Sequence, residues 1–225
     1  MNVLLLLILL LVGALATFFA GDKLASKVAL FFSVAIFGYA LTLLNQLNIG
    51  YDISYLSPWI ENPKVFLILE ADGLSMAMVV LTLALTPIII FSSFANNFKN
   101  SKTIYALILF MAFAMCGTFL AGDGILYYMF WELSLIPIYF IALIWGNGDA
   151  EERKKAVVKF FIYTIAGSLF MLAAFAYLYT KTHNFLLVDF AMVNLTINEQ
   201  FWIFLAFFLA YAIKIPLIPF HSWQA

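Results

Sequence analysis

Charged side chains and cysteine are both scarce in this sequence. Of its 225 residues only 10% are charged, one is a cysteine, Cys116, and two are histidines, His183 and His221. This inventory excludes a disulfide framework and argues against an iron–sulfur, haem or zinc site held by this chain. A net charge of −1 provides no basic field of the kind that indicates a nucleic-acid partner.

Apolar residues are abundant instead. They make up 66% of the chain, against about 45–50% in soluble domains. A soluble core of this size could not bury so much apolar surface, so the composition indicates the lipid bilayer as a partner. The N-terminal apolar run lacks a preceding Lys or Arg, and we therefore interpret it as a retained transmembrane helix rather than a signal peptide.

Seven apolar runs are long enough to cross a membrane, which takes about 20 residues in a helix. The runs are continuous rather than alternating, so they do not fit an outer-membrane barrel. The sequence predicts an all-α fold, a polytopic membrane helix bundle with about seven transmembrane helices at residues 3–20, 28–47, 73–94, 103–121, 124–145, 156–179 and 201–220. Polar loops connect them, and Asp72 is the predicted N-cap of the third helix.

Basic residues are distributed unequally between the loops on the two predicted sides of the membrane. The loops after the second, fourth and sixth helices contain Lys64 and Lys181, whereas the loops after the first, third and fifth contain eight basic residues, which are Lys23, Lys27, Lys99, Lys102, Arg153, Lys154, Lys155 and Lys159. Cytoplasmic loops carry the excess of Lys and Arg. The N-terminus is therefore predicted to lie outside and the loop at residues 146–155 in the cytoplasm.

Two charged residues lie deep within the predicted spans. They are Glu132 in the fifth helix and Lys214 in the seventh. An ionisable residue at the bilayer centre costs roughly 2.5–3.5 kcal/mol, and such residues usually mark ion or proton pathways. The alternative is a buried ion pair that only joins helices, although such pairs often add little stability.

Prolines accompany both charges. Pro137 cannot donate a hydrogen bond to the carbonyl of Leu133, next to Glu132. Pro216 and Pro219 free two carbonyls that bracket Lys214, those of Ala212 and Ile215. Interrupted helices are tolerated in membranes where they are buried in protein or line a wet cavity, and they recur at transporter sites. We therefore predict an interrupted seventh helix.

Two further residues are candidate proton relays. His221 follows Lys214 by seven residues, on roughly the same helix face, although an interfacial histidine at a helix end explains it equally well. Lys159 forms a stripe with Tyr163 and Gly167 at four-residue spacing, which is typical of a helix-packing face. The second interpretation of Lys159 is a relay between Glu132 and the cytoplasm.

Several motifs resemble the antiporter-like subunit M family of NADH-quinone oxidoreductase (respiratory complex I), the counterpart of mitochondrial chain 4. They are Ala-Asp-Gly-Leu-Ser at 71–75, Phe-Trp-Glu-Leu-Ser-Leu-Ile-Pro at 130–137, Lys-Phe-Phe-Ile-Tyr-Thr at 159–164 with Gly-Ser at 167–168, Lys-Ile-Pro at 214–216 and Pro-Phe-His-Ser-Trp at 219–223. The resemblance implies that Glu132 is the key proton-transfer carboxylate, that Lys214 titrates during pumping and that His221 is a candidate relay.

The resemblance also implies an architecture. The family has inverted five-helix repeats within about fourteen helices, as in many transporters. Residues 1–95 would hold the first three helices and residues 103–225 the first proton-translocating repeat. This sequence would then be the truncated first half of such a subunit, ending inside the broken helix.

The implied function is proton translocation coupled to quinone reduction in partner subunits of a bacterial inner (plasma) membrane complex. NADH, FMN, iron–sulfur clusters and quinone are expected on those partners, with no cofactor-binding or metal site in this chain. The expected partners are the other membrane subunits of complex I. Alternatives are a subunit of a cation/proton antiporter, a subunit of a membrane-bound hydrogenase, and a structural scaffold without a transport role.

Overall fold

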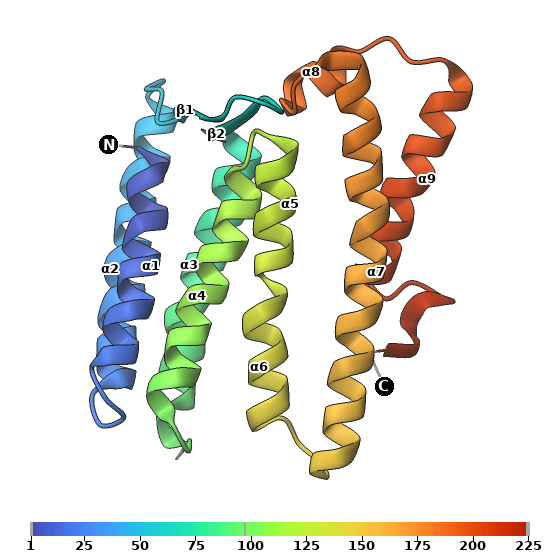
Figure 1. Ribbon diagram of the computed structural model, residues 1–225. Coiled ribbons are helices and arrows are strands. Elements are labelled where there is room, and N and C mark those ends of the chain that lie inside the picture. The colour runs from blue at the N-terminus through green and yellow to red at the C-terminus, as the bar shows by residue number, and fades with distance from the viewer. Residues whose placement is uncertain (1, 97, 224–225) are drawn as a thin grey trace. The chain divides into compact units, whose positions relative to one another are not determined.

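The chain folds into helices that gather into two compact units. The computed structural model describes residues 2–96 and 98–223. Unit 1 comprises Met1–Ser57 and Leu67–Gly122, and unit 2 comprises Pro58–Phe66 and Asp123–Ala225. In chain order the elements (Figure 1) are α1 (Val3–Phe19), α2 (Ala25–Asn48), β1 (Tyr55–Ile60), β2 (Val65–Leu69), α3 (Gly73–Ser92), η1 (Ser93–Ala95), α4 (Ser101–Leu120), α5 (Gly124–Leu133), α6 (Leu135–Trp145), α7 (Ala150–Thr182), α8 (Leu187–Met192), α9 (Ile197–Lys214) and η2 (Phe220–Trp223).

Unit 1 is a bundle of four helices that lie side by side in Figure 1. α1 packs on α2 and α4, and α3 packs on the same two helices. Fully buried leucines fill the centre, namely Leu6, Leu10, Leu43, Leu83 and Leu109. Large apolar side chains such as Phe31 and Phe91 point outward and stay exposed. This apolar outer surface fits a lipid environment.

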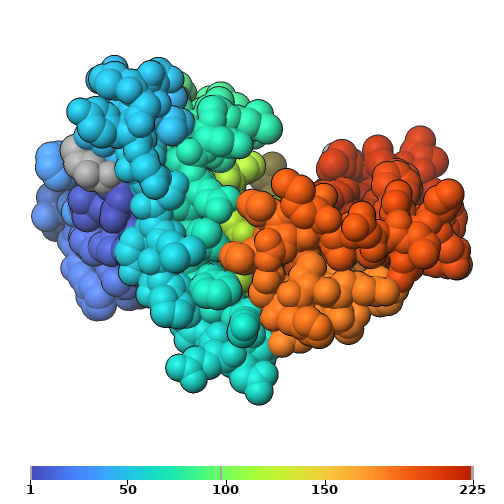
Figure 2. Space-filling view, turned by 90° about the horizontal axis from the view of Figure 1, so that it is seen from above, coloured from blue at the N-terminus to red at the C-terminus, as the bar shows by residue number. Residues whose placement is uncertain are grey.

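A short hairpin of β1 and β2 joins α2 to α3, where the sequence predicted only a loop. Its second strand, Val65–Leu69, is a run of apolar residues with Leu69 fully buried. Next to the hairpin, the carbonyl of Ile53 accepts a hydrogen bond from the amide of Val3 at 3.0 Å. Figure 2 looks onto this end of unit 1.

Unit 2 is built around the long helix α7, which packs on α5, α6 and α9. α5 and α6 follow one another along nearly one axis in Figure 1. An aromatic core lies where α5, α7 and α9 meet, and its buried members are Val65, Met171, Phe175, Phe185 and Ala210. The short helix α8, which was not predicted, adds Phe190 to this cluster.

The predicted all-α membrane fold is confirmed. Within the described residues, five helices are long and apolar enough to span a membrane, at Ala25–Asn48, Gly73–Ala95, Ser101–Leu120, Gly124–Trp145 and Ala150–Thr182. Two of the seven predicted spans are weaker candidates. Val3–Phe19 is apolar but has 17 residues, and α9 begins with a polar turn, Asn-Glu-Gln at 198–200, and ends at Lys214. The chain is a multi-pass membrane protein.

The two units do not follow the predicted division into residues 1–95 and 103–225. α4 falls within the second of these ranges, but it packs on α1 and α3 and belongs to unit 1. The proposed repeat boundary itself stays a prediction. Met1, Gln224 and Ala225, at the ends of the two ranges, lie outside the described residues.

Asp123 is a buried anchor that the sequence did not distinguish from the other loop acids. Its carboxylate is completely buried and accepts hydrogen bonds from the backbone amides of Ile125 (2.9 Å), Leu126 (3.3 Å) and Phe66 (3.1 Å). Burial raises the pKa of the Asp123 carboxyl, and the three amides oppose that shift. The side chain therefore caps α5 and ties it to β2.

Replacing Asp123 with Ala should destabilise the protein by about 2 kcal/mol, because a helix cap is lost and buried amides lose their acceptor. The measurement is the thermal unfolding midpoint of the detergent-solubilised full-length protein. Asp72→Ala is the matched control, since Asp72 caps α3 in the predicted position but is exposed, so a smaller loss is expected. Equal shifts for the two variants would contradict the anchoring role.

Candidate functional site

Glu132 lies in the last turn of α5, where the predicted fifth helix turns out to be interrupted. The sequence predicted one helix over residues 124–145, whereas α5 ends at Leu133 and α6 begins at Leu135. Two features explain the break. Pro137 removes the amide that would bond the Leu133 carbonyl, and the Ser134 hydroxyl donates to the Trp131 carbonyl at 2.7 Å.

The Glu132 carboxylate is held inside unit 2 without a full set of partners. Its Oε1 atom is buried and has no hydrogen-bond partner within the described part of the chain. The Ser168 hydroxyl of α7 and the Lys214 amine of α9 are the polar groups that act on this carboxylate. The structure thus brings together the two charges that the sequence singled out.

Lys214 is the last residue of α9, and the predicted interruption of the seventh helix is confirmed there. Its Nζ atom is buried and, like Glu132 Oε1, has no hydrogen-bond partner among the described residues. The amine lies over the ring of Trp131, 4.9 Å from the ring centroid. The two charges therefore influence one another without forming a direct ion pair.

The sequence suggested that prolines leave the carbonyls of Ala212 and Ile215 without a hydrogen bond. In the structure the first of these carbonyls has a donor. The Ala212 carbonyl accepts a hydrogen bond from the Leu217 amide at 2.8 Å. The neighbouring Ile213 carbonyl accepts one from the indole Nε1 of Trp223 at 2.9 Å. A side chain that follows the break thus caps the helix before it, a contact with no sequence signal.

Two tyrosines pack around the Trp131 ring on which the Lys214 amine lies. Trp131 meets Tyr211 edge to face, with ring centroids 5.4 Å apart, and Tyr127 lies 5.9 Å from the same indole. The hydroxyls of Tyr127 and Tyr211 are hydrogen-bonded at 3.0 Å. Tyr211 precedes Lys214 by three residues in the sequence, whereas nothing in the sequence assigned a role to Trp131 or Tyr127.

The predicted stripe on α7 is a packing face only in part: Gly167 is buried, whereas Lys159 and Tyr163 are exposed. A Cβ atom on Gly167 would approach the Ile213 side chain to 3.0 Å, so the missing side chain lets α9 come close to α7 beside Lys214. The Thr164 and Ser168 hydroxyls donate to carbonyls of their own helix, at 2.9 Å from Phe160 and Ile165. The close contact between Gly167 and Ile213 fixes the end of α9 against α7.

The two candidate relays lie at η2. Lys159 is exposed and donates a hydrogen bond to the Ser222 carbonyl, with its amine 5.9 Å from the Tyr163 ring. His221 is exposed on η2. The argument that seven residues place His221 on the face of Lys214 is wrong, because α9 ends at Lys214. The relay roles of both residues stay predictions.

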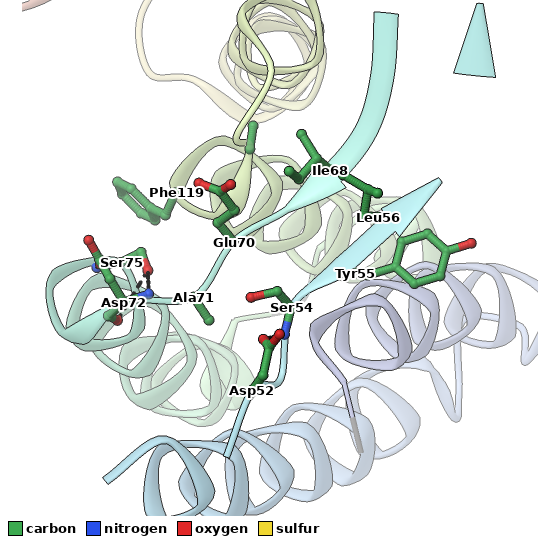
Figure 3. Close-up of a pocket in the computed structure, with 11 residues that line it drawn as sticks. Asp52, Ser54, Tyr55, Leu56, Ile68, Glu70, Ala71, Asp72, Ser75 and Phe119 are labelled. Carbon is green, nitrogen blue, oxygen red and sulfur yellow. Dashed lines mark hydrogen bonds between the residues drawn. The ribbon is translucent and has the colours of Figure 1, made fainter. Parts of the chain in front are cut away.

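Acidic side chains line hollows in each of the two units. Glu132 lines a pocket of about 390 Å³ in unit 2, together with Tyr128, Met129, Ile136 and Phe161. A second pocket, of about 690 Å³, lies in unit 1 and is lined by Asp52, Ser54, Glu70, Asp72 and Ser75 among others (Figure 3). Figure 3 shows Asp72 and Ser75 joined to each other by the α3 capping box. The polar lining of that pocket has no part in the acid–amine site.

Comparisons with known proteins identify the part of the chain that carries the site. Residues 121–225 match the family described as NADH:quinone oxidoreductase/Mrp antiporter, TM. These residues hold α5 to α9, with Glu132 and Lys214.

Relatives extend the similarity to the rest of the chain. The chain is 34% identical over 207 residues to NADH-quinone oxidoreductase subunit M of Rickettsia prowazekii, covering 90% of this chain and 42% of the relative. It is also 34% identical over 234 residues to F(420)H(2) dehydrogenase subunit M of Methanosarcina mazei, covering 97% and 46%. The chain therefore spans less than half the length of these relatives.

A solved structure shows the same fold. A chain of respiratory complex I from Thermus thermophilus with bound NADH matches with a TM-score of 0.84 and 26% identity, over 97% of this chain and 45% of that one. The resemblance to subunit M of complex I inferred from the motifs is confirmed.

Replacing Trp223 with Phe should loosen the break after α9, because phenylalanine keeps the ring contact with Phe160 but cannot donate to the Ile213 carbonyl. A hydrogen bond contributes about 0.5–1.5 kcal/mol, so amide hydrogen exchange at residues 211–218 should accelerate roughly two- to tenfold. Mass spectrometry of the exchanged full-length protein measures it. Trp202→Phe, at an exposed site on α9, serves as the control; unchanged exchange in the Trp223 variant would refute the capping role.

Proposed function

We propose that this chain is part of a proton-translocating membrane subunit of an NADH:quinone oxidoreductase. Quinone reduction in partner subunits would drive proton movement through Glu132 and Lys214. The observation that carries the proposal is the pairing of a carboxylate and an amine at two interrupted helices of the same unit, each with a buried polar atom that no described residue hydrogen-bonds. A structural pair would be expected to satisfy those atoms, whereas groups that exchange protons need free positions.

The geometry supports a transfer role for each residue. Glu132 lines a pocket, so a proton can reach its carboxylate from the pocket side, while the Ser168 hydroxyl acts on the carboxylate as a polar neighbour. Lys214 lies at the C-terminal end of α9, where the helix dipole favours a positive charge. Lys159 and His221, near one another on α7 and η2, are the proposed relays toward the cytoplasm, each by exchanging a proton at its side-chain nitrogen.

The proposed topology follows the basic residues. The N-terminus lies outside the bacterial inner membrane, and the loop at residues 146–155 lies in the cytoplasm, in keeping with the positive-inside distribution. The proposed partners are adjacent membrane subunits of the same complex. NADH, FMN, iron–sulfur clusters and quinone would be bound by partner chains, and the redox reaction would take place there.

A cation/proton antiporter subunit is the second candidate, because the matching family includes Mrp antiporters as well as quinone oxidoreductases. The two functions differ in their energy source. Membrane vesicles that contain the full-length subunit in its native complex should acidify on adding NADH and quinone if the first proposal holds. Acidification driven by a sodium gradient without NADH would instead support the antiporter.

Replacing Glu132 with Gln should abolish NADH-driven proton uptake into inverted vesicles, because glutamine keeps the size of the side chain but cannot carry a proton. The rate of vesicle acidification is measured with a pH-sensitive dye, and immunoblotting checks that the complex is assembled. Glu152→Gln, at an exposed glutamate in the first turn of α7, is the matched control and should pump normally. Wild-type pumping by an assembled Glu132→Gln complex would remove Glu132 from the pathway.

A further inference from the structure

The Lys214 amine rests on an aromatic face rather than on an acid. Its Nζ atom is buried without a hydrogen-bond partner among the described residues and lies 4.9 Å from the centroid of the Trp131 ring. A buried ammonium needs a substitute for the water that it has lost. The negative face of an indole is such a substitute, and tryptophan binds cations better than the other aromatic residues do.

The Trp131 ring is held in place from two helices. Tyr211 of α9 meets it edge to face at 5.4 Å, and Tyr127, one turn earlier on α5, lies 5.9 Å away. The hydroxyls of the two tyrosines bind each other at 3.0 Å, and the Phe175 ring of α7 packs edge to face against Tyr127 at 6.3 Å. The indole that faces the amine therefore has little freedom to turn away.

The Lys214 amine has two possible binding partners on α5, the face of the Trp131 ring and the carboxylate of Glu132. Neighbouring residues on a helix point about 100° apart, since 3.6 residues make one turn. The Glu132 carboxylate is directed toward Ser168 and the pocket beside Phe161, while the amine lies over Trp131. The titratable group that acts on Lys214 is Glu132 on α5. Tyr127 on α5 and Tyr211 on α9 contact the Trp131 ring, and His221 on η2 is exposed. From α7 the Ser168 hydroxyl acts on Glu132.

We propose that Trp131 is the positioning residue for Lys214: its indole face receives the ammonium and keeps it off Glu132 while the carboxylate is protonated. This rests on the proposed role of Glu132 and Lys214 in proton transfer. When Glu132 loses its proton, the attraction between the two charges competes with the indole, and the amine moves from the ring toward the carboxylate. Loss of the proton from Lys214 ends both attractions, and the starting pair returns only when the carboxylate and the amine have each taken up a proton again.

The charge of the ring face separates this proposal from simple packing of a core tryptophan. Trp131→Leu could fail to fold, so the test uses fluorinated tryptophans with one to four fluorines, placed at position 131 of the full-length subunit in its native complex. Each fluorine weakens the negative face while the ring keeps its shape and its N–H group. A packing role predicts no graded effect.

The pH profile of NADH-driven proton translocation is the measurement. Weakening the indole face makes the ammonium easier to deprotonate, so the alkaline limb of the profile should move to lower pH with each added fluorine. The total shift should be about one pH unit, a tenfold change in proton affinity. The same series at Trp202, whose ring contacts Phe201 and is exposed, should leave the profile unchanged.

Two results would overturn the proposal, and they differ from one another. A flat fluorine series at position 131, with translocation still lost in Glu132→Gln and Lys214→Ala, would refute the role of Trp131 and leave the proposed function standing. Wild-type translocation in assembled Glu132→Gln and Lys214→Ala complexes would refute the proposed function and the Trp131 role together.

Discussion

The removal of one carboxylate and one amine from water governs the arrangement of unit 2. Desolvation disfavours the charged forms of both groups, and their mutual attraction favours those forms. At an effective dielectric constant of about 20, charges a few ångströms apart interact by only a few kcal/mol, so their attraction offsets the desolvation in part. A pair in this balance changes its charge state in response to modest changes nearby, which is what a proton pathway requires.

The interrupted helices give the two charges unequal surroundings. Glu132 and Lys214 both lie in the last turn of a helix, at the ends of α5 and α9. The carbonyl end of a helix carries partial negative charge, which stabilises an ammonium and destabilises a carboxylate. Two features stabilise the charged form of Lys214, the helix end and the face of the Trp131 ring. The charged form of Glu132 is stabilised by the Ser168 hydroxyl and by the positive charge of the amine. The helix end and the ring face therefore favour the charged form of Lys214 more than anything near Glu132 favours the charged carboxylate.

Sequence reasoning found the charges but not the contacts that control them. Glu132 and Lys214 could be identified because an ionisable residue in a long apolar run is costly whatever its tertiary surroundings. The break at Lys214 was predictable from Pro216 for a similar local reason. The stacking of Trp131 on the amine and the capping of Ile213 by Trp223 join residues far apart in the chain, and tertiary packing alone brings them together.

The features that were predicted wrongly or missed have the same origin, because each of them depends on the tertiary structure rather than on the local sequence. The seven-residue spacing of His221 and Lys214 assumed a continuous helix, and the break removes that assumption. The β1–β2 hairpin was missed because its strands lie in a segment where turn-forming residues dominate, and pairing between strands is not a local property. Asp123 resembled the other loop acids because its burial depends on β2 and α5 meeting.

The close contact of α7 and α9 limits how the site can respond to partner chains. Gly167 lets Ile213 pack directly against α7, so α9 cannot shift at this point without opening a well-packed contact. The Lys214 amine, by contrast, is carried on a flexible four-carbon stem, and its two resting places on α5 belong to adjacent residues. A change of place requires new side-chain torsions, on the scale of rotamer exchange, rather than helix movement. Coupling to a redox reaction elsewhere would then reach this pair through the electric field and through neighbouring side chains, with the backbone of unit 2 left in place.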